Sequence, residues 1–250
     1  MKVEVAYITN RGKLRRRNED SILVAGELLS GISLERPRFE LLEGRESFLF
    51  AVADGMGGLP CGDVASRLTL EYLRDSQFSG KEEVVELLKR AKNHLDTYVE
   101  VHGRCYGMGT ALAGFLLSPF SSIAFNVGDC RVYRKRGKIE LLTRDHTEAY
   151  ELYERGVIDM EGLRYHPLRN VLTSAIVVGY PEEFEVFSRE LDVKKGDTFL
   201  VCSDGLWDEL PEGSIERCMS LPVKEGSFCL FEGAYEGGRD NISFILFRVL

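Results

Sequence analysis

Several features that define other classes of protein are missing from this chain of 250 residues. It has no apolar run of about 18 residues, the minimum length of a membrane-spanning helix. Its first residues, MKVEVAYITNRGK, lack the basic-then-apolar order of a secretory signal. We therefore expect a cytoplasmic protein that does not associate with membranes. No internal repeat, low-complexity tract or linker is evident, and the length suits one domain covering residues 1–250.

Cysteine is sparse, and the chain is acidic overall. The cysteines occur singly with no C-x-x-C pair, and Cys130 and Cys202 lie inside apolar runs, so we expect reduced thiols in place of disulfides. The formal net charge of −8 argues against a nucleic-acid surface, although Arg15, Arg16 and Arg17 form a local basic run. The sequence contains no P-loop and no Rossmann glycine fingerprint, which disfavours a dedicated nucleotide-binding fold.

Apolar residues alternate at strand spacing or recur at helical spacing in separate segments. Strands are predicted at residues 3–9, 21–29, 48–54, 110–117, 121–128, 131–135, 138–143, 198–204 and 242–250. Helices are predicted at residues 64–73, with Asp63 as the N-cap, and at residues 82–101, with a weaker one near residues 211–221. Strands followed by two helices and then by hairpins indicate an antiparallel α+β fold rather than a βαβ repeat.

Two stretches follow neither period. We interpret residues 30–47, which are polar, as a surface loop. Residues 144–185 lack regular apolar spacing and contain the turn formers Gly156, Gly162 and Pro167. Long irregular stretches inside a compact domain are often functional, so we interpret residues 144–185 as a flap beside the functional site.

Four aspartates lie where strand-like runs meet glycine turns. Asp54, Asp129 and Asp204 each end an apolar run, whereas Asp240 begins one. Antiparallel strands could bring all four carboxylates to one end of a sheet. Such a cluster repels itself unless a cation occupies it, and carboxylate oxygens without His or thiolate partners suit Mg²⁺ or Mn²⁺ better than Zn²⁺. The residues alone therefore predict a metal site for phosphate chemistry.

A series of blocks resembles, in order, the signature motifs of the metal-dependent PPM family of serine/threonine protein phosphatases. The blocks are RRRNEDS, VADGMGG, GMGTALAG, NVGDCRVYR, RDHT, SDGLWD and GGRDNIS, and together they span nearly the whole chain. The resemblance implies a sandwich of two antiparallel sheets flanked by helices, in four αββα layers, with the site at one end. That architecture agrees with the α+β pattern of the predicted elements.

The resemblance also implies a set of metal ligands and a mechanism. Two Mg²⁺ or Mn²⁺ ions would hold a water between them that attacks phosphorus directly, without a covalent intermediate. Asp54 would bridge the ions, with the carbonyl of Gly55 as a further ligand, and Asp204 and Asp240 would complete the first ion. Bacterial-type members use an aspartate that matches Asp129 to help hold a third, weaker ion.

The second ion would take Glu19 or Asp20, directly or through water. Arg15 matches the family arginine that pairs with phosphate oxygens, a contact that suits a guanidinium fork. Asn241 either supports the ligand beside it, Asp240, or caps the start of a strand. We expect Arg16 and Arg17 to form a solvated turn.

In the flap, His166 and Arg169 are polar groups able to meet a phosphopeptide, with a structural role for His166 equally open. His146 is expected to support its loop, and Trp207 to pack behind the metal loop. Many eukaryotic members carry a histidine proposed as the general acid where this chain has Met56. A thioether cannot donate a proton, so protonation of the leaving group must come from water or another side chain.

The leading hypothesis is a monomeric phosphatase that acts on phosphoserine and phosphothreonine in the protein substrates of a kinase. One rival is a non-catalytic relative that only binds such proteins; it is disfavoured because Asp20, Asp54, Asp204 and Asp240 are all present. A second rival is a metallohydrolase that cleaves a small phosphate ester or a nucleotide. Assays with a phosphopeptide and with nucleotides separate these hypotheses.

Overall fold

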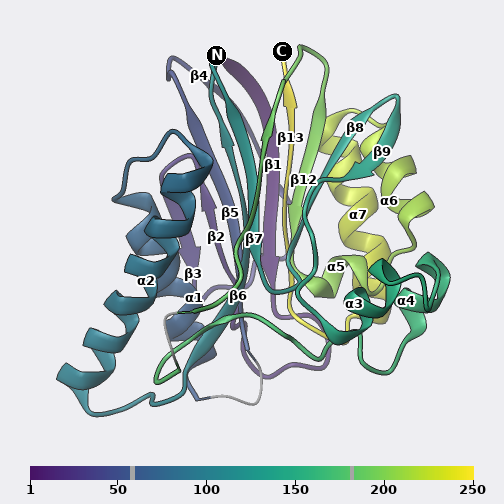
Figure 1. Ribbon diagram of the computed structural model, residues 1–250. Coiled ribbons are helices and arrows are strands. Elements are labelled where there is room, and N and C mark those ends of the chain that lie inside the picture. Colours follow the sequence, from purple (N-terminus) through teal and green to yellow (C-terminus); the bar gives the residue numbers. More distant parts are fainter. Residues whose placement is uncertain (57–59, 181–182) are drawn as a thin grey trace.

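Two antiparallel β-sheets pack face to face, with helices on both outer faces (Figure 1). The computed structural model describes residues 1–56, 60–180 and 183–250. Helices α1 and α2 cover one sheet, and helices α6 and α7 cover the other (Figure 1). The predicted α+β sandwich with four αββα layers is confirmed.

The strand order of each sheet brings distant parts of the sequence together. The six-stranded sheet has the order β4-β1-β13-β12-β8-β9. Its strands are β1 (Lys2–Asn10), β4 (Arg38–Glu43), β8 (Arg131–Arg136), β9 (Lys138–Leu141), β12 (Thr198–Cys202) and β13 (Ile242–Val249). The seven-stranded sheet has the order β11-β7-β6-β5-β2-β3, and β10 also pairs with β6. Its strands are β2 (Ser21–Val24), β3 (Glu27–Ser30), β5 (Phe48–Gly55), β6 (Gly109–Leu117), β7 (Ser122–Val127), β10 (Ile176–Val177) and β11 (Phe187–Leu191).

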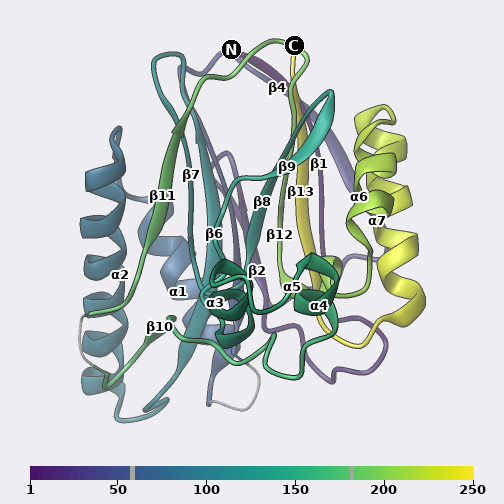
Figure 2. The same cartoon turned by 45° about the vertical axis from the view of Figure 1, so that its right-hand side comes forward.

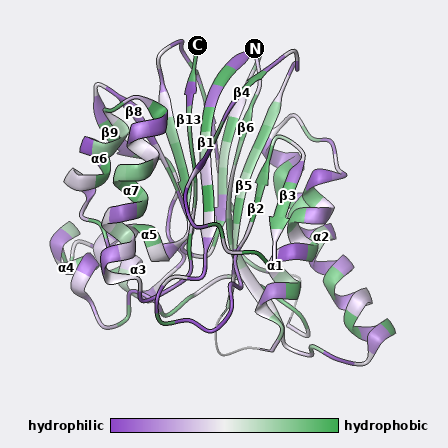
Figure 3. Cartoon of the chain, turned by 180° about the vertical axis from the view of Figure 1, so that it is seen from behind, coloured by the Kyte–Doolittle hydropathy of each residue, from purple (hydrophilic) through white to green (hydrophobic). Residues whose placement is uncertain are grey.

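The central strands of the sandwich are apolar on both faces because each sheet is covered on both sides. In β5, Phe50 and Val52 belong to the core between the sheets, whereas Ala51 and Ala53 belong to the core under α1 and α2. The ring of Phe50 stacks on Phe247 of the opposite sheet, with centroids 4.3 Å apart. Burying one such side chain stabilises a fold by about 1.5–3 kcal/mol. Figure 3 shows hydrophobic residues along the central strands.

The outer helices place their apolar stripes on the sheets. On one side lie α1 (Gly62–Arg74) and α2 (Lys81–His102), and the predicted apolar stripe of α2 is largely buried. On the other side lie α5 (Asp204–Trp207), α6 (Glu212–Met219) and α7 (Val223–Gly237). The flap contains α3 (Glu148–Glu154) and α4 (Met160–Tyr165), which lie at one end of the sandwich (Figure 2). Within the described ranges, no helix is long and apolar enough to span a membrane.

Some elements differ from the sequence expectation. Residues 30–47 are not only a loop, because β4 pairs with β1 there as an edge strand with mostly exposed side chains. The predicted strand at residues 21–29 is a hairpin that turns at Ala25 and Gly26, both with positive φ. The sequence pattern also missed β11 and α7. Helix α7 contains Gly226, and a Cβ there would lie 2.6 Å from the carbonyl oxygen of Cys218, so glycine lets α7 pack closely on α6.

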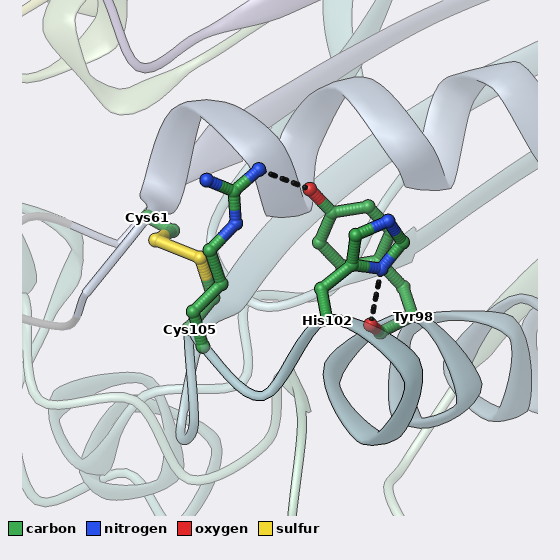
Figure 4. Close-up of a disulfide and its surroundings, with 5 residues drawn as sticks. Cys61, Tyr98, His102 and Cys105 are labelled. Atoms are coloured by element: carbon green, nitrogen blue, oxygen red, sulfur yellow. Dashed lines mark hydrogen bonds between the residues drawn. A yellow bond between two sulfur atoms is a disulfide. The ribbon is translucent and has the colours of Figure 1, made fainter.

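The expectation that all cysteines are reduced was wrong. Disulfides join Cys61 to Cys105, as Figure 4 shows, and Cys218 to Cys229. The partners are 44 and 11 residues apart and meet only through the tertiary fold, so spacing in the sequence could not reveal them. Cys130 and Cys202 are free and buried, as expected.

The first disulfide holds the start of α1. Cys61 is the N-cap residue of this helix, with a φ of 57°, and Asp63, the expected N-cap, lies in the first turn instead. The bond ties this helix start to the loop that follows α2 (Figure 4). The start of α1 is therefore anchored covalently at Cys61.

Pairing of the first and last strands sets the position of the candidate site. Residue Asn10 at the end of β1 lies opposite Ile242 at the start of β13. The loop that carries Arg15 and Glu19 therefore begins beside the turn that carries Asp240. In the other sheet, β5 ends at Gly55 at the same end of the sandwich (Figure 1).

Candidate metal centre

One cavity of about 370 Å³ collects most of the predicted site residues at this end of the sandwich. It is lined by Arg15, Glu19, Asp54, Gly55, Met56, Ala111, Asp129, Asn170, Leu172, Asp204, Asp240 and Asn241. The four aspartates that the sequence places at strand ends all reach this wall. Four separate connections thus converge on one cavity because antiparallel strands end together.

The carboxylates of the cavity are buried and repel one another. Burial is the main cause that raises the pKa of Asp54 well above its ordinary value, and the charges of neighbouring aspartates add to it. The same two causes raise the pKa of Asp129 well above its ordinary value and the pKa of Asp204 to about 7. Such a group favours either protons or a cation. A divalent cation is the partner that keeps all the carboxylates ionised at neutral pH.

Two buried oxygens strengthen the case for a cation. Oδ1 of Asp20 and Oδ1 of Asp204 have no hydrogen-bond partner among the described residues. Leaving a buried acceptor unpaired costs about 1–3 kcal/mol, and more when the group is charged. For Asp204, which lines the cavity, a bound cation would supply the missing partner.

The carboxylates line one cavity, but they do not form a complete set of metal ligands by themselves. In the described part of the chain, no three acidic, histidine or cysteine side chains come close enough to hold an ion by themselves. Asp240 is engaged elsewhere: its Oδ2 lies 2.5 Å from Nη2 of Arg15, and its Oδ1 accepts from the Asn241 backbone at 2.8 Å. Mg²⁺ and Mn²⁺ sites commonly keep several waters and take few protein ligands. The oxygen donors therefore fit hydrated divalent ions.

Two glycines allow the ligand loops to approach closely. A Cβ on Gly55 would lie 2.3 Å from the carbonyl oxygen of Gly62 and 2.7 Å from that of Glu19. A Cβ on Gly205 would lie 1.9 Å from the carbonyl oxygen of Asn241. Any larger residue would push the loops apart, because these neighbours are main-chain atoms.

Glu19 and Asp20, between which the sequence left the choice of ligand open, lie in different surroundings. Glu19 lines the cavity. Asp20 is buried behind it, with Oδ2 accepting a hydrogen bond of 2.9 Å from Oγ of Ser203. Glu19 is therefore placed to reach an ion in the cavity, whereas Asp20 contacts the residue that precedes Asp204.

The side chain of Asn241 connects the loop after β1 to the turn before β13. Its Oδ1 accepts from the backbone of Glu19 at 2.8 Å, and its Nδ2 donates to the carbonyls of Arg11 at 3.0 Å and Arg17 at 2.9 Å. The predicted support of Asp240 comes instead from the Asn241 main chain. The amide thus fixes the loop on which Arg15 and Glu19 lie.

The flap contributes different residues from those the sequence suggested. Asn170 and Leu172 line the cavity. Arg169 instead forms an ion pair with Asp208, with nitrogen–oxygen distances of 2.8 and 3.1 Å. Nδ1 of His166 accepts from the backbone of Leu168 at 3.2 Å. Asn170 lies in an irregular segment, so no periodic signal in the sequence could have identified it.

A buried ion pair supports the cavity from behind. The Arg131 guanidinium donates to Asp145 at 2.5–3.0 Å and lies 3.6 Å from the centre of the Trp207 ring. Nε1 of Trp207 donates to the carbonyl of Asp129 at 2.9 Å. Trp207 packs behind the metal loop, as predicted, and this hydrogen bond also joins that loop to the turn at Asp129.

His146 lies between β9 and α3 and contacts Gly128 in the turn between β7 and β8. Its backbone N–H donates to the carbonyl of Gly128 at 2.9 Å, and its Nδ1 accepts from the backbone of Gly128 at 3.1 Å. Burial is the main cause that lowers the pKa of His146, which favours the neutral ring that can accept this bond. These contacts fit the supporting role expected for His146.

Known phosphatases of one family are similar to this chain in sequence. A family model for protein phosphatase 2C matches residues 39–220. The chain is 31% identical to the serine/threonine phosphatase stp of Listeria monocytogenes, with 96% of this chain and 93% of that protein covered. It is 30% identical to the serine/threonine protein phosphatase PstP of Mycobacterium tuberculosis, with 97% of this chain and 44% of that protein covered.

Solved structures agree with the sequence comparison. The structure of the M. tuberculosis phosphatase PstP/Ppp matches with a TM-score of 0.79 at 29% identity, covering 100% of this chain and 99% of that one. The catalytic domain of PstP in complex with two manganese ions matches with a TM-score of 0.76 at 28% identity, covering 100% of both chains.

Proposed function

The chain belongs to the protein phosphatase 2C family, and we propose that it hydrolyses phosphoserine and phosphothreonine in proteins in a Mg²⁺- or Mn²⁺-dependent reaction. The observation that carries this proposal is the cavity where buried, mutually repelling carboxylates meet the guanidinium of Arg15. The manganese complex of the related PstP domain supports a divalent metal in this chain as well. Attack by water without a covalent intermediate is part of the same proposal.

The residues that would hold two ions are the cavity-lining oxygens of Glu19, Asp54, Gly55, Asp204 and Asp240. When bound, the ions neutralise the phosphate and lower the pKa of the attacking water. Asp129 lines the same cavity and is our proposed ligand of a third ion.

Arg15 is placed to bind the phosphate of the substrate. Its guanidinium lies on the cavity wall, with one Nη2 contact to Asp240 and 43% of its side chain exposed. The hydrogen bond to Asp240 is the main cause that raises the pKa of Arg15, so the side chain stays charged. A guanidinium has five N–H donors, so donors remain for phosphate oxygens. Arg15 therefore brings positive charge to the mouth of a negatively charged cavity.

At position 56 the wall offers no proton donor for the leaving group. Met56 lies where some family members carry histidine, and its Cε packs so closely on Gly109 that a Cβ there would lie 2.1 Å away. A thioether cannot act as a general acid. We therefore infer that substrates with good leaving groups are hydrolysed faster when chemistry limits the rate.

A direct assay tests the proposed function against its rivals. Phosphate release from a phosphoserine peptide, an aryl phosphate and a nucleotide is measured with Mn²⁺, with Mg²⁺ and with chelator. The proposal expects metal-dependent turnover of the peptide and its loss in Asp54→Ala. Faster turnover of the nucleotide would indicate a small-molecule hydrolase, and peptide binding without turnover would indicate a binding module.

We also propose that the protein acts as a cytoplasmic monomer on the products of a serine/threonine kinase. The disulfides Cys61–Cys105 and Cys218–Cys229 stand against the usual reducing conditions of that compartment. Thiol counting on protein purified without reductant tests the disulfides, and light scattering, which gives the molecular mass, tests the monomeric state. Free thiols at all six positions would contradict the disulfides.

A further inference from the structure

One flap residue, Asn170, presents an uncharged polar group to the catalytic cavity. The sequence suggested two nearby residues, Arg169 and His166, as contacts for the substrate. In the structure Arg169 is paired with Asp208, and Nδ1 of His166 accepts a hydrogen bond from the backbone of Leu168. Asn170 lines the cavity and is exposed at its mouth. Its side chain makes no hydrogen bond within the described ranges, so the amide is available to a ligand.

The main chain on both sides of Asn170 is fixed. On one side, the ion pair between Arg169 and Asp208 attaches the flap to the residues that follow Asp204. On the other side, Leu172 forms a β-bridge with Thr147 and packs against the core between the sheets.

Backbone hydrogen bonds complete this anchoring. The Glu148 N–H donates to the carbonyl of Val171 at 3.0 Å, and the Thr173 N–H donates to the carbonyl of His146 at 2.8 Å. The Val171 N–H donates to the carbonyl of Leu168 at 3.1 Å. The main chain that carries Asn170 is therefore held in place before any substrate arrives, which reduces the backbone entropy lost when a ligand binds.

The chemistry of an amide suits one part of a phosphopeptide in particular. The floor of the cavity is lined by carboxylates, and Arg15 supplies positive charge for the phosphate. A carboxamide carries no charge but can donate and accept at the same time. A peptide main chain offers the matching N–H and C=O, and an aryl phosphate offers neither.

We propose that Asn170 is a specificity-determining residue that hydrogen-bonds the main chain of the substrate beside its phosphorylated residue. The inference rests on the proposed phosphatase function and names a subsite for its protein substrates. It assigns the selection of peptides to Asn170 rather than to His166 or Arg169.

The test compares two substrates in three variants. In Asn170→Ala, kcat/KM for a phosphoserine peptide should fall roughly 3- to 30-fold, the range for one or two neutral hydrogen bonds, mainly through KM. The loss on p-nitrophenyl phosphate should be several times smaller. Asn170→Gln keeps the amide and should recover part of the peptide activity. Tyr165→Ala, an exposed flap change off the cavity wall, serves as the matched control and should lose less than twofold on the peptide.

Each other outcome overturns the proposal. Equal loss on both substrates with a raised Mn²⁺ half-saturation concentration would make Asn170 a support of the metal site. Equal activity of the wild type and Asn170→Ala on the peptide would remove its role in substrate binding. If the wild type cleaves neither substrate with metal, the proposed function itself fails, and that result is visible before any variant is compared.

Discussion

Removing one carboxylate from the candidate metal centre should stabilise the protein when metal is absent. Asp204→Asn keeps the shape of the side chain and removes a buried negative charge. Burial, followed by the charge of Asp240, raises the pKa of Asp204 from its ordinary 3.8 to about 7. The ionised side chain is therefore disfavoured in the folded protein.

The size and sign of the effect follow from this pKa. A rise of about three units corresponds to about 4 kcal/mol of destabilisation when the group is fully ionised. Because the folded pKa is raised, the destabilisation is complete above about pH 7 and is relieved as pH falls from 7 towards 4. The amide that replaces the carboxylate is also a buried polar group, and leaving it without all its hydrogen bonds costs part of this free energy. We therefore expect a gain of about 1–3 kcal/mol at pH 8.

Urea unfolding in chelator at pH 8 and pH 6 measures this gain. Asp197→Asn is the matched control, because Asp197 is also buried but is hydrogen-bonded to Arg136 at 2.5 and 2.7 Å. Arg136 and the backbone of Lys194 lower the pKa of Asp197, so this variant should lose about 1–3 kcal/mol. In saturating Mn²⁺, Asp204→Asn should instead be less stable than the wild type, because the variant lacks one metal ligand.

Two results would refute the reasoning. If Asp204→Asn destabilises the metal-free protein as much as Asp197→Asn does, the carboxylates are held by favourable contacts rather than by a missing cation. If the gain at pH 8 persists unchanged at pH 6, ionisation of Asp204 is not its cause.

Three further changes test other parts of the account. Asp145→Asn leaves the buried Arg131 without its counter-charge, so the free energy of unfolding should fall by about 3–5 kcal/mol in denaturant titrations; a loss below 1 kcal/mol would contradict this. Gly205→Ala places a Cβ 1.9 Å from the carbonyl oxygen of Asn241, so calorimetry should show Mn²⁺ affinity reduced about tenfold or more, and unchanged affinity would show that the loops can move apart. Met56→His should speed single-turnover hydrolysis of alkyl phosphates relative to aryl phosphates, whereas a wild-type rate independent of leaving-group pKa would mean that another acid is present.

Regular periodicity made much of the fold predictable from the sequence. Helix α2 has a long apolar stripe, and strand β5 is apolar on both faces. Together they predict a sheet that is covered by helices on one side and by a second layer on the other. Helix α7 was missed because Gly226 lowers its apparent helical propensity, although close packing on α6 requires that glycine. Edge strand β4 was missed because an exposed edge shows weak alternation.

The candidate site was predictable where local sequence determines it. Asp54 lies at the end of the buried strand β5, and Asp204 lies two residues after the buried strand β12. Each is followed by a glycine, and this local pattern places both carboxylates at strand ends. Asn170 and the pairing of Arg131 with Asp145 depend on how the flap crosses the end of the sandwich. Contacts of that kind have no local signature. The same reason explains why the disulfides could not be predicted.

The central claim is that bound divalent ions in this cavity are required for direct hydrolysis of a phosphoprotein. The most direct measurement is phosphate release from a phosphoserine peptide while chelator-treated enzyme is titrated with Mn²⁺, with rapid-quench samples examined for phosphate attached to the protein. The account predicts no turnover in chelator, activity that rises with metal occupancy, no activity in Asp54→Ala and no phosphorylated enzyme at any time. Full activity in chelator, or a phosphoenzyme that forms and decays at the rate of turnover, would contradict it.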